Sequence, residues 1–146
     1  MSIFFSRQCE YALQAIMYIA LKPEDEKVPI RELAKHLDIP FHFLGKILQD
    51  LTHNGLLKSL KGPTGGFSLG IPATRITPYH IVHSIDGSSF MQKCFLGFPT
   101  CSEEEHCAMH TQWKELRQKI YSLLNSKNIV QMAKEMKKPQ YQFLRD

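Results

Sequence analysis

The chain lacks any long hydrophobic run. Its most apolar stretch, residues 11–21, has 11 residues and includes Gln14, whereas a membrane-spanning helix needs about 20 apolar residues. Residues 2–6 carry no basic n-region and no cleavage-like site follows them, so no secretory signal is indicated. We therefore expect a cytoplasmic protein with no membrane partner.

Two further absences narrow the class of protein. The sequence holds no nucleophile–base pairing and no phosphate-binding motif, so we expect no enzymatic activity. Its 146 residues, 43% hydrophobic and 22% charged, are typical of one globular domain with room for a helical extension. The net charge of +4 permits a polyanionic partner without requiring one.

Cysteine is scarce but unevenly placed. Only four are present, and three of them, Cys94, Cys101 and Cys107, fall within fourteen residues, with His110 three positions further on. In a reducing compartment, cysteines gathered in this way are metal or redox ligands more often than disulfides. Spacing alone suits an iron–sulfur cluster, a zinc ion held with a histidine, or thiols without metal.

The first half of the chain shows helical periodicity. A helix is expected at residues 6–21, and its apolar residues surround nearly the whole circumference, so more than one face is buried, either in its own core or against a partner subunit. Two short amphipathic helices follow, joined at Pro40, which suits a first helical position, and the second ends at Asn54 and Gly55. Their apolar residues recur at i, i+3, i+4 and i+7: Ile30, Leu33, Ala34 and Leu37, then Leu44, Ile47, Leu48 and Leu51.

Two helices joined this tightly predict a helix-turn-helix. The outward face of the second helix carries four side chains that can reach base edges and phosphates, although a merely solvated face has the same composition. These candidate DNA-binding residues are His42, Lys46, Gln49 and His53.

A short β-hairpin is expected directly afterwards, from strand-like residues 56–60 and 67–69 around a glycine-rich tip. We expect Lys61, Thr64 and Gly65 to contact DNA there, because glycine permits close backbone approach and lysine supplies charge. Residues 41–80 hold four cationic side chains against one acidic side chain, a local net charge of +3. A plain hairpin remains an alternative, but the combination favours a winged helix that binds DNA.

These segments resemble the winged-helix iron–sulfur transcriptional regulators of the IscR and NsrR type. The resemblance rests on residues 9–20 (CEYALQAIMYIA), on residues 43–70 (FLGKILQDLTHNGLLKSLKGPTGGFSLG), and on the three cysteines with spacing C-x6-C-x5-C. Lys61 stands where the family's wing pattern has an arginine. The fold implied is mainly α with a small β-hairpin wing: a winged helix-turn-helix plus a long dimerisation helix.

The resemblance also implies a cofactor and its ligands. Cys94, Cys101 and Cys107 would hold an iron–sulfur cluster, with 2Fe-2S favoured and 4Fe-4S possible, and the C-x-x-H arrangement favours His110 as fourth ligand. Glu10, which aligns with an acidic ligand of NsrR-type members, and Cys9 are the alternative fourth ligands. We interpret residues 103–105 as a solvated charged loop and Trp113 as a packing residue.

The resulting hypothesis is a homodimeric, DNA-binding transcriptional regulator that senses redox, iron–sulfur status or nitric oxide. We expect a winged-helix domain at residues 1–85, a cluster-binding loop at 86–108, a dimerisation helix and C-terminal helical segment at 109–138, and a tail at 139–146. The stripe that would pair two subunits comprises Leu116, Ile120, Leu123 and Leu124. The alternative is a zinc-stabilised or thiol-based redox regulator of the same fold, without a cluster.

Overall fold

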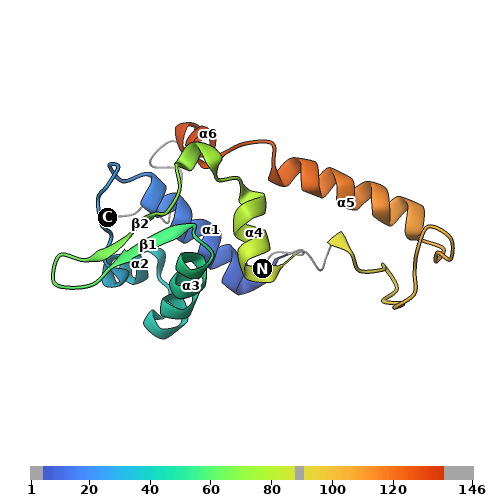
Figure 1. The fold of residues 1–146 in the computed structure, drawn as a ribbon, viewed down its shortest axis with the longest axis horizontal. Coiled ribbons are helices and arrows are strands. Elements are labelled where there is room, and N and C mark those ends of the chain that lie inside the picture. Colours follow the sequence, from blue (N-terminus) through green and yellow to red (C-terminus); the bar gives the residue numbers. More distant parts are fainter. Residues whose placement is uncertain (1–4, 88–90, 137–146) are drawn as a thin grey trace.

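The computed structural model describes residues 5–87 and 91–136, which form a helical body with a small antiparallel hairpin and one projecting helix (Figure 1). The expected fold class, mainly α with a hairpin wing, is confirmed. In chain order the elements are α1 (Arg7–Ala20), α2 (Ile30–Leu37), α3 (Phe41–His53), β1 (Leu57–Leu60), β2 (Gly66–Leu69), the 3-10 turn η1 (Ala73–Arg75), α4 (Pro78–Asp86), α5 (His110–Leu124) and α6 (Ile129–Glu135).

The first helix lies at the centre of the body. Seven of its residues are buried, and they contact α2, α3, α4, α6 and β2, so the near-continuous apolar surface of α1 is largely enclosed by its own chain. Ser6 caps the helix by accepting a hydrogen bond from the Cys9 backbone N–H, and both its N–H and its hydroxyl donate to the carboxylate of Asp86. The start of α1 is thereby tied to the end of α4.

The helix-turn-helix follows the apolar periodicity. Leu33 and Leu37 of α2 and the leucine stripe of α3 are buried against α1. Tyr18 of α1 donates a hydrogen bond of 2.7 Å to Glu32, which fixes α2 against the central helix. The expected stop is confirmed, because Gly55 adopts φ +84°. Pro40 is the extended cap residue before α3 rather than its first helical residue, so the predicted start was one residue early.

The hairpin pairs Leu57 with Leu69 and Leu60 with Gly66, which confirms the wing. Gly65 is required by the hairpin itself, because a Cβ at this position would lie 1.9 Å from the Leu60 carbonyl oxygen. The glycine that we expected to permit approach to a sugar–phosphate edge therefore already serves the hairpin. Helix α4, which the sequence analysis did not predict, follows η1; Thr77 precedes it, and the Thr77 backbone N–H donates to His80 Nδ1.

Helix α5 extends away from the body, and the cysteine-bearing loop, residues 91–109, lies at its far end (Figure 1). Its predicted apolar stripe is divided between two environments. Ile120 and Leu124 are buried against Cys9 and Val82 of the same chain. Leu116 and Leu123 are exposed, at 43% and 69% of their surface. Only part of the stripe is therefore open to a second subunit.

The expected tail, residues 139–146, and residues 137–138 of the segment before it lie outside the described residues. Within residues 5–87 and 91–136, no helix combines the length and the hydropathy that crossing a bilayer requires.

Candidate metal centre and DNA-binding surface

The cysteine-bearing loop folds back on itself and brings three thiols together. The Sγ atoms of Cys94, Cys101 and Cys107 all lie within 4.8 Å of one another, and those of Cys94 and Cys107 are 3.6 Å apart. All three side chains are half-buried. In the part of the chain that the structure describes, this is the one group of three or more potential ligands gathered closely enough to hold a metal ion.

A fourth donor joins the thiols from the first residue of α5. His110 Nδ1 lies 3.3 Å from Cys101 Sγ. The other ring nitrogen, Nε2, is buried 3.5 Å from Glu103 Oε1 without a hydrogen bond. Lys114, one turn further along α5, contacts the same Glu103 carboxylate. Residues 103–105 are all exposed, as expected for a solvated loop, but the Glu103 carboxylate lies against His110 and Lys114.

The two alternative fourth ligands lie on α1, in the body rather than beside the loop of the same protomer (Figure 1). Cys9 is fully buried against Val82 and Ile120, and this burial raises the pKa of its thiol to about 12. A buried, protonated thiol in the core is poorly placed to bind metal. Glu10 is half-buried in the first turn of α1.

The three loop thiols differ in acidity. Desolvation raises the pKa of Cys94, but hydrogen bonds from the backbone N–H groups of Phe98 and Leu96, together with those from the Cys101 and Cys107 thiols, lower it to about 7. For Cys101, a hydrogen bond from the Cys107 backbone lowers the pKa, while burial and the neighbouring thiols raise it more, so its pKa is raised. One thiolate is therefore available near neutral pH to begin metal binding.

We expect iodoacetamide to alkylate Cys94 before Cys101 or Cys9 in the metal-free protein. Because the pKa of Cys94 is depressed in the folded state, its reactive thiolate persists above about pH 7 and is lost as the pH falls through that value. Peptide mass spectrometry of a time course at several pH values would give the order. Equal rates at Cys94 and Cys101, or early modification of Cys9, would contradict it.

The donor set fits a metal centre. Two thiolates on one metal at about 2.3 Å lie roughly 3.8 Å apart in a tetrahedral arrangement, close to the 3.6 Å between Cys94 and Cys107. Cys101 and His110 form a second close pair at 3.3 Å. Two donor pairs suit the two irons of a binuclear cluster, and four converging donors also suit one tetrahedral ion.

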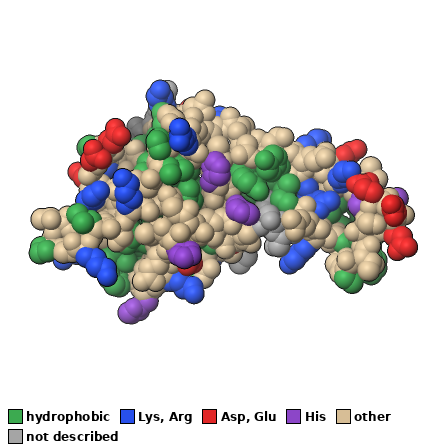
Figure 2. Space-filling view, in the orientation of Figure 1, with side chains coloured by type: hydrophobic (Ala, Val, Ile, Leu, Met, Phe, Trp, Pro, Cys, Tyr) green, Lys and Arg blue, Asp and Glu red, His purple; other side chains and the backbone are tan. Residues whose placement is uncertain are grey.

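The DNA-binding candidates lie together at the opposite end of the molecule. His42, Lys46 and Gln49 are exposed on α3, as is His53 at its end, while the leucine stripe faces the core. Lys61 and Thr64 are exposed in the hairpin turn, and Gly65 is half-buried. Figure 2 shows Lys, Arg and His side chains around α3 and the hairpin, and acidic side chains in two groups, one at the loop end and one above the hairpin. The basic side chains around α3 and the hairpin suit contact with a polyanion.

Two exposed phenylalanines were not singled out from the sequence. Phe41 and Phe43, at the start of α3, are 53% and 38% exposed, and the Phe43 ring meets Tyr11 edge-on at 5.6 Å. Both lie outside the buried stripe of α3, which comprises Leu44, Ile47, Leu48 and Leu51, and that position was the signal that the sequence offered. Trp113, which we interpreted as a packing residue, and Arg117, which no sequence pattern marked, line the small cavity beside the cysteines.

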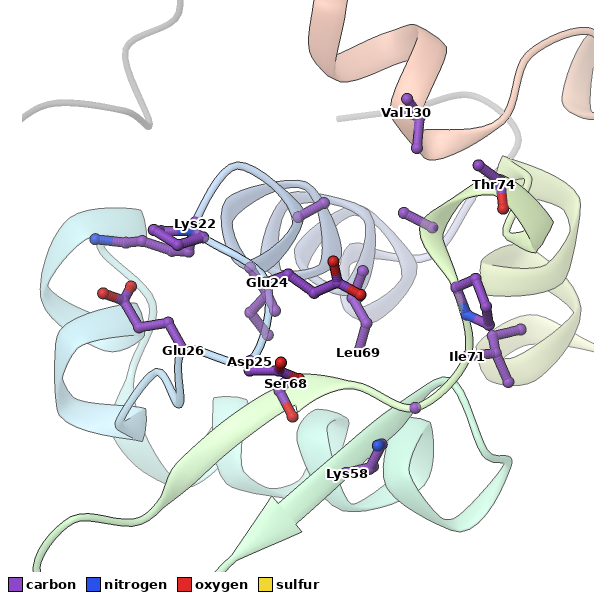
Figure 3. A pocket seen from close by; sticks show the side chains of 16 residues that line it. Lys22, Glu24, Asp25, Glu26, Lys58, Ser68, Leu69, Ile71, Thr74 and Val130 are labelled. Carbon is purple, nitrogen blue, oxygen red and sulfur yellow. The ribbon is translucent and has the colours of Figure 1, made fainter.

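A larger cavity of about 450 Å³ lies between the α1–α2 loop, β2 and the start of α6 (Figure 3). Its rim carries side chains of both signs, among them Lys22, Glu24 and Lys58. Lys27 Nζ donates to Ser68 Oγ at 3.0 Å and ties the loop to the hairpin. The cavity holds no thiol, so the metal centre is assigned to the cysteine loop.

Fold and site together define a winged-helix DNA-binding protein that carries a candidate cysteine metal site. The chain belongs to the Rrf2 family, described as iron-dependent transcriptional regulators, whose sequence model matches residues 5–135.

Known relatives agree with this assignment. A candidate HTH-type transcriptional regulator of Aquifex aeolicus is 35% identical over 129 residues, covering 87% of this chain and 89% of the relative. The HTH-type transcriptional regulator IscR of Yersinia enterocolitica is 30% identical over 123 residues, covering 84% of this chain and 74% of IscR. The structure of T. potens IscR superimposes with a TM-score of 0.77 at 20% identity, covering 97% of this chain and 93% of that one, and so shows the shared fold.

Proposed function

We propose that this protein is a homodimeric, cytoplasmic transcriptional regulator whose operator affinity depends on an iron–sulfur cluster held by Cys94, Cys101, Cys107 and His110. The observation that carries the proposal is the convergence of three thiols and one imidazole at the start of α5. The proposal keeps the expected division: a winged-helix DNA-binding domain at residues 1–85, a cluster-binding loop at 86–108, and a dimerisation helix with a C-terminal helical segment at 109–138. The stimulus would be redox state, cluster supply or nitric oxide.

A 2Fe-2S cluster is favoured by the way the donors pair. Cys94 with Cys107, and Cys101 with His110, form two close pairs, which matches two terminal ligands on each of two irons. When bound, such a cluster supplies a redox-active group that oxidants can attack. The three half-buried cysteines and His110 would bind it, and the mostly exposed loop around them would leave it accessible.

A zinc-stabilised regulator of the same fold is the second candidate. It is favoured by one measurement: all three Sγ atoms lie within 4.8 Å of one another, so they need move little to reach the roughly 3.8 Å between thiolates on a single tetrahedral ion. A thiol-based redox regulator would use the same three side chains without metal.

The route from the site to DNA runs through α5. His110 is both a site residue and the first residue of α5, whose last turn is buried against α1 and α4. Occupying the site would therefore restrict the start of the helix that sets the position of one subunit against another. The cluster can change operator affinity only by as much as its own binding free energy differs between the dimer geometry that binds DNA and other dimer geometries.

The proposal is tested by anaerobic purification followed by visible absorption, iron and sulfide analysis, and gel-shift assays on DNA upstream of the gene. A brown protein with equal iron and sulfide, which binds that DNA differently before and after cluster loss, is the expected result. A colourless protein with one zinc per chain would favour the second candidate.

We expect the protein to sediment as a dimer at micromolar concentration even without metal, because Leu116 and Leu123 leave an apolar face on α5. Leu123→Glu should shift it to monomer. In the parent dimer, the two recognition helices should meet DNA half-sites about 34 Å apart. Gln118→Glu, an exposed change away from that face, is the control. A monomeric parent protein, or a Leu123→Glu variant that remains dimeric, would contradict this interface.

A further inference from the structure

The segment that leads into Cys94 is fastened to α5 by two side-chain hydrogen bonds. The Trp113 indole Nε1–H donates to the Lys93 carbonyl oxygen at 2.8 Å. Arg117 Nη1 donates to the Met91 carbonyl oxygen at 2.6 Å. Both acceptors belong to the three residues before Cys94, so α5 holds the backbone on which this thiol is carried.

The two donors on α5 and the two acceptors in the loop are separated by similar distances. Trp113 and Arg117 are four residues apart and thus about 6 Å apart along the helix axis. Met91 and Lys93 are two residues apart, a length of chain that spans at most about 7 Å. His110 lies three residues before Trp113, on the same helix face. One face of α5 therefore presents a site imidazole and the two donors that hold the loop.

Trp113 also contacts the chain on the other side of the thiol. The Phe95 ring meets the indole edge-on, with ring centroids 5.6 Å apart and planes at 71°. The indole thus contacts the residue before Cys94 through a hydrogen bond and the residue after it through ring packing. This bracket restricts the position of Cys94 relative to His110.

Arg117 adds a charge beside the thiols. Its side chain lines the same small cavity as Cys94, Cys101 and Cys107. Its Nε atom is buried and has no hydrogen-bond partner among the described residues. Three thiolates brought within 4.8 Å repel one another, and a neighbouring guanidinium offsets part of that cost.

We propose that Trp113 and Arg117 are positioning residues for the cysteine site: they hold residues 91–93 against α5 so that Cys94 is presented to the metal together with His110. This inference rests on the proposed function. It assigns to α5 a role in assembling the site in addition to pairing subunits, and it replaces our interpretation of Trp113 as a packing residue only.

The test compares Trp113→Phe, which removes the indole N–H and keeps a ring, with Arg117→Met, which removes the second donor and its charge. The probe is Co²⁺, titrated anaerobically into the metal-free full-length chain and followed by thiolate–cobalt absorption. We expect each variant to bind Co²⁺ about tenfold more weakly, as for other residues that orient metal ligands. Each reconstituted cluster should also be lost faster in air. Lys119→Met, which removes one exposed charge from another face of α5, is the matched control and should behave as the parent protein.

A second readout is made on the parent protein, with one variant as its control. Trp113 is the only tryptophan, so its indole N–H gives a single resonance in a ¹⁵N-labelled sample. We expect its hydrogen exchange to slow further when Co²⁺ binds, and Cys94→Ala should abolish that change. An indole N–H that exchanges as in an unfolded peptide, with and without Co²⁺, would overturn the proposal.

The outcomes separate this inference from the proposed function. If the parent protein binds Co²⁺ and forms a cluster while Trp113→Phe and Arg117→Met match it in affinity and cluster lifetime, the positioning role is wrong and the function stands. If the parent protein takes up neither Co²⁺ nor a cluster at its cysteines, both fail. Arg117→Lys separates the hydrogen-bonding role of Arg117 from its charge, because lysine restores the charge but not the planar guanidinium.

Discussion

Replacing Cys101 with alanine is expected to abolish the visible absorption and the iron content of the anaerobically purified protein. Cys101 lies within 4.8 Å of both other thiols and 3.3 Å from His110 Nδ1, so its loss leaves His110 without its paired donor. DNA binding should then no longer change on exposure to oxygen or nitric oxide. Because the side chain lies in an irregular, partly exposed loop, the free energy of unfolding of the metal-free chain should change by less than about 0.5 kcal/mol.

Thr100→Ala, an exposed neighbour in the same loop, is the control for that experiment and should retain full iron. Iron and sulfide analysis, visible absorption and sedimentation of both variants supply the comparison. A Cys101→Ala protein that keeps its iron and sulfide would show that the loop is not the cluster site.

The identity of the fourth ligand is decided by comparing His110→Ala with Glu10→Ala. We expect the histidine change to leave a cluster that forms but is lost faster, and His110→Cys to make it more persistent, since a thiolate binds iron more strongly than an imidazole. Imidazole ligation also makes binding pH-sensitive, because the ring must be neutral to coordinate. A cluster that is perturbed by the glutamate change alone would assign the ligand to α1 of the partner subunit.

The double substitution of Lys46 and Lys61 by alanine is expected to produce the largest loss of DNA binding. Both side chains are exposed at the winged-helix end, one on α3 and one in the hairpin turn. Each phosphate contact that is lost should lower the slope of log binding constant against log salt concentration by about one. Binding to all DNA sequences should weaken alike. Gel-shift titrations at several salt concentrations would measure both quantities.

Lys134→Ala on α6, another exposed lysine, is the matched control and should keep the parent slope. Changes at His42 or Gln49 should instead alter base preference, at about 1–3 kcal/mol for the affected step. If none of the four substitutions changes operator binding, α3 is not the recognition helix.

Local signals in the sequence were sufficient for the winged helix. The period of Leu44, Ile47, Leu48 and Leu51 marks one face of a helix, and a glycine that tolerates positive φ marks its end. The hairpin could likewise be predicted from local sequence, because a glycine-rich turn between two short apolar runs has few other stable conformations. Helix α4 was missed because its core contacts, Ile81 and Val82, are too few to establish a period.

The cysteine spacing likewise indicated a metal or redox site, because three thiols and a histidine within seventeen residues can reach one point. Spacing did not predict which donors lie in pairs, nor that Glu103 faces His110. These depend on how the loop folds back on α5, and an irregular loop has no period from which its path can be read.

Contacts between distant segments were decided only by the tertiary structure. The pairing stripe reads as one face of α5, yet Ile120 and Leu124 are buried by Cys9 and Val82, which come from two other helices. The bond from Trp113 to Lys93 joins residues 20 positions apart, and that from Arg117 to Met91 joins residues 26 apart. Side-chain periodicity states which residues share a face; which surface that face meets depends on how the helices and the loop pack around α1 and α5.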